Sequence, residues 1–140
     1  MANKLPIIIQ TVVYKIVDYS LLFLMLKRTE DRGGFWTTVN GTLETHENVK
    51  ECQIRELFEE TQIKDVLVWG PELHRFSFDY KDTIMTVLVF SAEVEPGQEV
   101  VINEEHTEYK WLSFDQALEQ LKFDDDKKAL TVCKESIENK

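Results

Sequence analysis

The sequence predicts one α/β domain (α+β), spanning residues 1–140, in which strands are flanked by helices. Residues 7–17 and 21–27 are rich in β-branched and large apolar side chains and are separated by the polar stretch Asp18-Tyr19-Ser20, which predicts an early hairpin. More strand-like segments follow, and the last third of the chain carries helix signals. A chain of 140 residues that is 43% hydrophobic can bury one core and leaves no room for a second domain.

The other elements are read from apolar runs and from residues that start helices. Short apolar runs predict strands over residues 35–39, 64–69, 74–80 and 83–93, with turns at Gly70-Pro71 and Lys81-Asp82. Ser113 and Gln116 have the spacing of a capping box, which predicts a helix. The acidic run 124–126 favours the start of a closing helix that extends to about residue 137.

A glutamate-rich helix is predicted to begin near residue 47. Residues 40–46 lack helical periodicity and are read as a loop, and Thr45 precedes a run of helix formers as its expected N-cap. Ile54, Leu57 and Phe58 are expected to form part of the core-facing stripe. The helix should therefore be amphipathic, with its charged side free for chemistry.

Three carboxylates crowd that charged side. Glu56, Glu59 and Glu60 lie three or four residues apart and therefore project from one side of a helix. Two like charges about 4 Å apart repel by roughly 4 kcal/mol at the effective dielectric near a protein surface, so this cluster calls for a cation. Hard oxygen ligands of this kind suit Mg²⁺, which binds through a few carboxylates together with substrate phosphates.

The spacing around this cluster resembles a known family signature. The chain reads Gly41-x5-Glu47-x7-Arg55-Glu56-Leu57-x-Glu59-Glu60, which is similar to the Nudix box. Gln62 stands where the family has its last glycine, a position that ends the helix in a left-handed conformation. That mismatch carries no ligand atom, so it puts the local backbone and the stability in question more than the catalysis.

The resemblance implies a fold and a set of roles. The fold is a Nudix-type α/β/α sandwich with a mixed central sheet. The metal is Mg²⁺, with Mn²⁺ as a substitute, and its implied ligands are Glu56, Glu59, Glu60 and Glu105, with the carbonyl of Asn40 as a further one. Arg55 orients a box carboxylate, and Glu47, Glu51 or both hold its guanidinium. Gly41 and Glu47 are the structural members of the motif.

A second segment extends the resemblance. Glu105-x3-Tyr109-x-Trp111-Leu112 is similar to a stretch in many Nudix hydrolases whose upstream glutamate reaches back to the metals. Glu105 is the expected residue, with Glu104 and Glu108 as rivals. The general base is either Glu56 or Glu105, and the sequence leaves both open.

Substrate contacts are expected just before the box. Arg28 is the first choice for the phosphate tail, with Lys27 and Arg32 as further candidates, because all three precede the strand that leads into the box. Trp36 is the first choice for stacking on a base or pterin ring. The other aromatic candidates, which are more often core residues on strands, are Phe76, Phe78, Tyr80 and Trp111.

The expected activity follows from the subfamily that the flanking residues resemble. Val39-Asn40-Gly41 and the segment around Trp111 look like bacterial dihydroneopterin triphosphate pyrophosphohydrolases, also known as dATP pyrophosphohydrolases. The expected reaction is Mg²⁺-dependent cleavage of a nucleoside or pterin triphosphate to the monophosphate and pyrophosphate. The alternatives are another Nudix substrate, such as ADP-ribose, a nucleotide sugar or a dinucleoside polyphosphate, and a nucleotide-binding module without turnover.

Charge and composition restrict the partners. Sixteen basic and 26 acidic residues give a formal charge of -10, and the basic residues form no stripe, so neither nucleic acid nor an anionic membrane is expected as a partner. The expected partner is a small phosphorylated molecule, and the sequence does not decide between a monomer and a homodimer. Two cysteines make no disulfide framework, which favours a cytoplasmic protein with reduced thiols.

Overall fold

The hairpin predicted at the N-terminus forms the middle of the sheet. The computed structural model describes residues 4–139. Strand β1 (Lys4–Val17) pairs antiparallel with β2 (Ser20–Arg28). Asp18 and Tyr19 join them with φ values of 49° and 67°, the left-handed conformations that a two-residue hairpin turn requires. The predicted hairpin is confirmed.

The other strands extend this hairpin into a mixed sheet of eight strands. β1 runs parallel to β7 (Thr83–Val94), and the other pairings are antiparallel. The remaining strands are β3 (Trp36–Thr37) and β8 (His106–Leu112), which pair with β2; β4 (Val39–Glu44), which pairs with β1; and β5 (Val66–Trp69) and β6 (His74–Tyr80), which pair with β7. The mixed central sheet expected from the sequence is therefore present.

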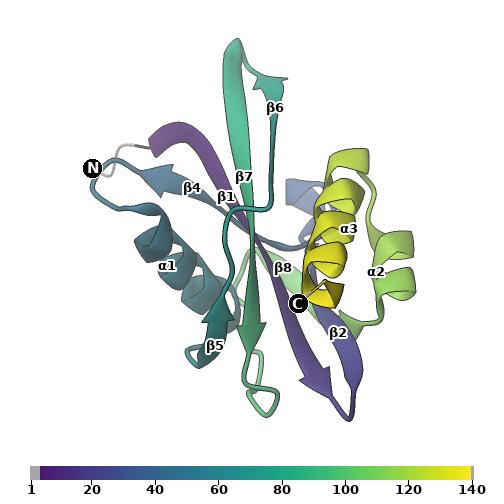
Figure 1. Ribbon diagram of the computed structural model, residues 1–140. Helices are drawn as coiled ribbons and strands as arrows, with labels where there is room; N and C mark the ends of the chain where they lie inside the picture. Colours follow the sequence, from purple (N-terminus) through teal and green to yellow (C-terminus); the bar gives the residue numbers. More distant parts are fainter. Residues whose placement is uncertain (1–3, 140) are drawn as a thin grey trace.

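Helices cover both faces of the sheet. Helix α1 (Val49–Thr61) lies on one side, and α2 (Phe114–Gln120) and α3 (Asp124–Glu138) lie on the other (Figure 1). Strand β1 shows the alternation that this requires: Val12 packs into the cluster that contains α2 and α3 residues, whereas Val13 packs into the cluster that contains an α1 residue. The predicted α/β/α sandwich is confirmed.

The prediction that residues 40–46 form a loop is wrong for residues 40–44, whereas Thr45 and His46 do form a turn. Residues up to Glu44 belong to β4, whose Asn40 and Thr42 lie opposite Gln10 and Ile8 of β1. Its glycine and most of its polar residues have low strand propensity, so the sequence pattern does not indicate a strand. The strand is stabilised instead by pairing with the long central strand β1. The strand brings Gly41 directly against α1.

The start and the apolar face of α1 also differ from the prediction. Asn48, not Thr45, is the N-cap: its side chain accepts from Glu51 N–H at 2.8 Å, and Glu51 Oε1 accepts from Asn48 N–H at 2.9 Å. Leu57 is buried, but Ile54 and Phe58 are 51% and 42% exposed. The core-facing position is therefore confirmed for Leu57 and wrong for Ile54 and Phe58.

The C-terminal helices follow the sequence signals closely. Ser113 Oγ accepts from Gln116 N–H, and Gln116 Oε1 accepts from Ser113 N–H, each at 3.3 Å. The capping box predicted for α2 is therefore confirmed. Within residues 4–139, no helix combines the length and the apolar character that crossing a membrane requires.

Candidate active site

Arg55 organises the charged side of α1. Its Nε and Nη2 donate to the two carboxylate oxygens of Glu47 at 3.0 and 2.6 Å, a bidentate ion pair in which the Glu47 side chain is only 5% exposed. Its Nη1 donates to Glu56 Oε1 at 2.5 Å. Hydrogen bonds from Arg55 lower the pKa of Glu47 to about 2. Of the two partners considered for Arg55, Glu47 makes the contact, whereas Glu51 caps the helix.

The absence of a side chain at Gly41 lets Glu56 reach its position. A Cβ atom at residue 41 would overlap the Cγ and Cδ atoms of Glu56. A side chain at this position would therefore displace the Glu56 carboxyl group from its place against β4.

Glu56 and Glu60 form a pair of neighbouring, largely buried carboxyl groups on α1. Burial raises the pKa of both carboxyl groups, and each acts on the other. The Glu60 side chain is 3% exposed, and its Oε2 atom has no hydrogen-bond partner. A buried acceptor without a partner is costly, and a bound cation would satisfy it. These residues therefore fit the Mg²⁺ ion that the family resemblance implies.

His106 lies next to this pair, although sequence reasoning assigned it no role. Its Nε2 atom is 3.7 Å from Glu60 Oε1, and its buried Nδ1 has no hydrogen-bond partner. Burial lowers the pKa of His106, which favours the neutral ring at pH 7. Its place directly after Glu105 in the chain was the only available signal.

The third box carboxylate, Glu59, is more exposed than Glu56 and Glu60, and a second group of possible metal ligands lies before α1. Glu59 is 49% exposed, and its Oε2 lies 3.4 Å from Arg55 Nη1. Ligand atoms of Glu44, His46 and Glu47 lie within 4.8 Å of one another and form a second candidate group of metal ligands. Because Arg55 already binds both oxygens of Glu47, an ion there would break a well-formed ion pair, and this group makes the poorer metal site.

A polar cavity of about 370 Å³ opens beside these carboxylates. Among the described residues, its lining combines acidic and basic side chains from several elements with a few neutral residues. The acidic residues are Glu44, Glu56, Glu59 and Glu105, the basic ones are Lys4, Arg28, Arg32 and Arg55, and the neutral ones are Ile8, Asn40, Gly41 and Thr42. No signal in the sequence pointed to Lys4, Ile8, Thr42 or Glu44, which the pairing of β1 with β4 brings together. Arginines and carboxylates that line one cavity suit a ligand with both phosphates and a cation.

The predicted substrate residues divide into two groups. Arg28 and Arg32 line the cavity, and Arg28 also lies over the ring of Phe35, 5.1 Å from its centroid. Lys27 instead pairs with Glu108 at 3.7 Å. The Trp36 ring lies against Lys110, whose Nζ is 5.0 Å from the ring centroid. Neither Lys27 nor Trp36 is part of the cavity lining, and their roles stay predictions.

Of the three glutamates considered for the second segment, Glu105 reaches the cavity. Its Oε1 accepts from Arg32 Nη1 at 3.2 Å, and its Oε2 accepts from Asn103 Nδ2 at 3.1 Å. Glu108 pairs with Lys27, away from the lining, and Glu104 is exposed. The geometry therefore favours the first choice.

Gln62 takes over the backbone role of the glycine that it replaces. It is the C-cap of α1 with φ 62° and ψ 14°, and its N–H donates to Phe58 O at 2.8 Å. A non-glycine residue in this left-handed conformation costs roughly 1 kcal/mol or more. The helix end keeps its geometry, so the mismatch affects local strain and leaves the carboxylates in place.

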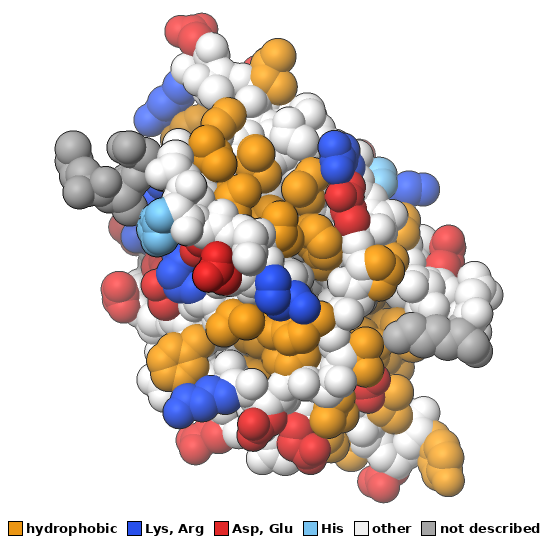
Figure 2. Space-filling view, turned by 60° about the vertical axis from the view of Figure 1, so that its left-hand side comes forward, with side chains coloured by type: hydrophobic (Ala, Val, Ile, Leu, Met, Phe, Trp, Pro, Cys, Tyr) orange, Lys and Arg blue, Asp and Glu red, His pale blue; other side chains and the backbone are white. Residues whose placement is uncertain are grey.

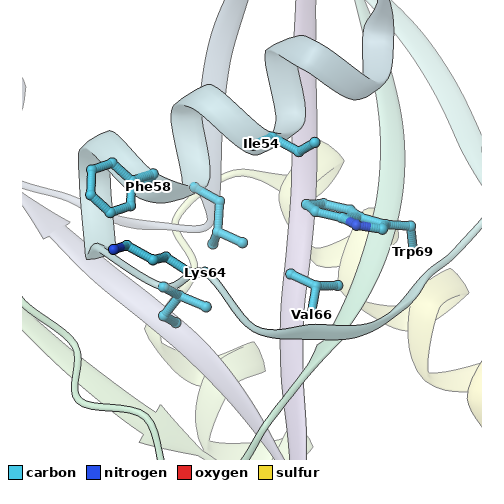
Figure 3. A pocket seen from close by; sticks show the side chains of 7 residues that line it. Ile54, Phe58, Lys64, Val66 and Trp69 are labelled. Atoms are coloured by element: carbon cyan, nitrogen blue, oxygen red, sulfur yellow. The ribbon is translucent and has the colours of Figure 1, made fainter.

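A second cavity on the other side of α1 is apolar. Its volume is about 240 Å³, and it is lined by Ile54, Leu57, Phe58, Ile63, Lys64, Val66 and Trp69 (Figure 3). Figure 2 shows hydrophobic side chains gathered on this face, with basic side chains beside them. The lining contains no carboxylate, so this cavity has none of the groups that the expected chemistry needs.

The fold and the polar cavity together define a class: an α/β/α domain in which a carboxylate-rich helix and two arginines face one polar cavity. The NUDIX domain family matches residues 11–132. The chain therefore belongs to the NUDIX family.

Individual relatives support this membership. The chain is 34% identical over 104 residues to an octanoyltransferase of Myxococcus xanthus, covering 71% of this chain but only 29% of that protein. It is 30% identical over 117 residues to the asymmetrical bis(5'-nucleosyl)-tetraphosphatase of Rattus norvegicus, covering 81% of this chain and 80% of that protein. The solved structure of the Escherichia coli dihydroneopterin triphosphate pyrophosphohydrolase matches with a TM-score of 0.77 and 25% identity, covering 93% and 95% of the two chains.

Proposed function

We propose that this protein is a Mg²⁺-dependent pyrophosphohydrolase that cleaves a nucleoside triphosphate or dihydroneopterin triphosphate to the monophosphate and pyrophosphate. The observation that carries this proposal is the buried carboxylate pair Glu56 and Glu60, with an unpartnered Glu60 oxygen, beside a cavity that Arg28 and Arg32 also line. A site of this kind offers one side to a divalent cation and the other to phosphates.

The metal side is formed by α1. Glu56, Glu59 and Glu60 are the proposed ligands, with Glu105 and the carbonyl of Asn40 as further ones. When bound, Mg²⁺ would neutralise these carboxylates and make a water molecule and a phosphorus atom more reactive. Mn²⁺ is the expected substitute, because it accepts the same oxygen ligands.

The phosphate side is formed by arginines. Arg28 and Arg32 would bind phosphate oxygens and orient the anhydride bond, since guanidinium groups make bidentate hydrogen bonds with phosphates. A chain with a formal charge of -10 would otherwise repel a polyphosphate. These local cations therefore explain how an acidic protein accepts an acidic substrate.

The chain's own groups would move one proton. A water oxygen forms a bond to phosphorus, the anhydride P–O bond breaks, and either Glu105 or Glu56 accepts the water proton. Arg55 would hold Glu56 in place, because it bridges Glu56 to the buried Glu47 carboxylate. Lys27 and Trp36 remain further proposed substrate contacts.

A second substrate class has its own support. The rat relative named as an asymmetrical bis(5'-nucleosyl)-tetraphosphatase aligns with 81% of this chain. Such a dinucleoside tetraphosphate would need the same ligands and would differ only in the group that leaves. Product analysis separates the two substrates, because a triphosphate releases pyrophosphate, whereas asymmetrical cleavage of a dinucleoside tetraphosphate releases a nucleoside triphosphate and a monophosphate.

The test is a side-by-side assay of dihydroneopterin triphosphate, dATP, a diadenosine tetraphosphate and ADP-ribose with Mg²⁺. Glu59→Gln should lower kcat/KM by about 10²- to 10³-fold, because it removes a charge that stabilises the transition state. Glu119→Gln, an exposed change on α2, is the matched control and should behave like the wild type. Absence of cleavage of every compound, with Glu59→Gln binding Mg²⁺ as the wild type does, would contradict the proposal and favour a binding module.

A further inference from the structure

The carboxylate of Glu105 is restrained in this structure by two partners. Arg32 Nη1 donates to its Oε1 at 3.2 Å, and Asn103 Nδ2 donates to its Oε2 at 3.1 Å. The positive charge of Arg32 next to this carboxylate opposes the approach of a cation. In this arrangement Glu105 is therefore less available to a metal or to a water proton than its position in the cavity suggests.

The backbones that carry the two residues are fixed to each other. Thr29 N–H donates to Glu105 O at 3.2 Å, and Arg32 N–H donates to Thr29 O at 3.0 Å. The side chains are much freer, with exposures of 45% for Arg32 and 35% for Glu105. The ion pair can therefore open by side-chain rotation alone, without movement of the loop.

A polyphosphate entering the cavity would compete for Arg32. Both residues line the same cavity as the box carboxylates Glu56 and Glu59. An exposed ion pair held by one hydrogen bond is weak. A phosphate tail carries several negative charges and offers bidentate hydrogen bonds to a guanidinium, so it is the stronger partner.

We propose that Arg32 acts as a substrate-operated latch on Glu105. Without substrate, Arg32 occupies Oε1 of Glu105; when phosphate binds, Arg32 turns to it and this oxygen becomes available as a ligand or base. This inference rests on the proposed function of the same cavity. It makes Arg32 both a phosphate-binding and a positioning residue, and it couples substrate arrival to completion of the site.

The latch predicts two effects of opposite sign for Arg32→Gln. Without substrate, Mg²⁺ should bind about two- to fivefold more tightly, because Glu105 is released from an exposed ion pair. The phosphate probe, inorganic tripolyphosphate in metal-free buffer, should bind about tenfold more weakly, because a charge-assisted contact is lost. A residue that only bound phosphate would leave Mg²⁺ affinity unchanged, and a merely structural residue would weaken both.

A double-mutant cycle with Glu105→Gln separates the latch from a general change in charge. Isothermal titration of Mg²⁺ would be carried out on the wild type, Arg32→Gln, Glu105→Gln and the double variant. In the Glu105→Gln background, Arg32→Gln should no longer tighten Mg²⁺ binding. By reciprocity, Glu105→Gln should tighten tripolyphosphate binding only when Arg32 is present.

Arg75→Gln is the matched control, because it removes an exposed arginine that pairs with Glu72 at 2.8 Å away from the cavity lining. It should change neither titration. Unchanged or weaker Mg²⁺ binding by Arg32→Gln, or tightening of equal size in the Glu105→Gln background, overturns the latch. Neither titration requires turnover, so a failed substrate screen would refute the proposed function while the cycle still decides whether Arg32 restrains Glu105.

Discussion

Two glutamates of the same motif, Glu47 and Glu60, have opposite environments. Glu47 lies just before α1, and both of its oxygens bind Arg55, which holds its pKa well below the ordinary value. Glu60 lies in the last turn of α1, where burial and the neighbouring Glu56 raise its pKa. Both side chains are almost completely buried, with exposures of 5% and 3%.

The difference shows that one cluster of carboxylates can contain both a residue that stabilises the fold and a residue that is available to bind a ligand. The Glu47–Arg55 pair neutralises itself and holds Glu56 by a further hydrogen bond, so it contributes to the structure. Glu60 has a free acceptor atom and a like charge beside it, so the folded protein holds it at a cost. Groups kept at a cost to stability are where a ligand is expected to act.

The largest expected effect is at Glu60. Glu60→Gln should lower kcat/KM by about 10³-fold or more, because it removes a metal ligand that carries a charge. Without metal, the same variant should be more stable than the wild type by about 1 kcal/mol, since a neutral amide needs no proton uptake on folding, whereas the buried Glu60 carboxyl has a raised pKa. Calorimetric unfolding in EDTA and steady-state kinetics test the two parts. Destabilisation without metal would mean that Glu60 is a structural residue like Glu47.

A smaller effect, of the opposite kind, is expected at Glu47. Glu47→Gln should destabilise the fold by about 2–3 kcal/mol, because Arg55 loses its bidentate partner in a partly buried position. Glu138→Gln breaks an exposed pair with Lys134 at 3.2 Å and is the control, with an expected change below about 0.5 kcal/mol. Urea unfolding of both variants measures this contrast. Equal effects would show that burial does not distinguish the two pairs.

The pH dependence of stability should separate the two glutamates as well. Glu56 and Glu60 have raised pKa values when folded, so their contribution is present below the ordinary value of 4.5 and is lost as pH rises through the raised values. Glu47 contributes above 4.5 and loses its contribution as pH falls toward about 2. Metal-free protein should therefore melt at lower temperature as pH rises from about 5 to about 8. Saturating Mg²⁺ should remove this decline, and a decline that persists with Mg²⁺ would assign it to other groups.

The smallest expected effect lies at the end of α1. Gln62→Gly should stabilise the fold by about 0.5–1 kcal/mol, because glycine relieves the left-handed strain but adds freedom to the unfolded chain. Activity should be unchanged, since Gln62 supplies no group to the cavity lining. Thermal unfolding measures the gain. A loss of stability would show that the Gln62 side chain makes a compensating contribution.

Much of the fold was readable from the chain because its strongest signals are local. The hairpin of β1 and β2, strands β6 and β7, and the capping box of α2 lie where apolar runs, turn residues and cap spacing predict them. Strand β4 was missed because its polar residues gain their stability from pairing with β1. The N-cap of α1 was misplaced by three residues, since Thr45 and Asn48 are both suitable caps and only the end of β4 decides between them.

The site was predictable to the same extent. Motif spacing identified Glu56, Glu59, Glu60 and Arg55 as candidates. Arg55, Glu56 and Glu59 line the polar cavity, and Glu60 is buried beside them. His106 was not predicted as a site residue, because its contact with Glu60 joins β8 to α1, and these elements are more than 40 residues apart in the chain. Lys27 and Trp36 were chosen by proximity in the chain, which does not determine which way a strand directs its side chains.

The chain by itself determined which groups are available: a helix with carboxylates on one side, an arginine able to hold them, and flanking arginines for phosphate. Residues a few positions apart on a helix must share a face, so this much follows from covalent geometry. Tertiary structure decided which carboxylate is neutralised and which is left unsatisfied. Burial, the nearest opposite charge and the orphaned oxygen of Glu60 depend on how β4, β8 and α1 pack, and electrostatic energies follow distance in space rather than separation along the chain.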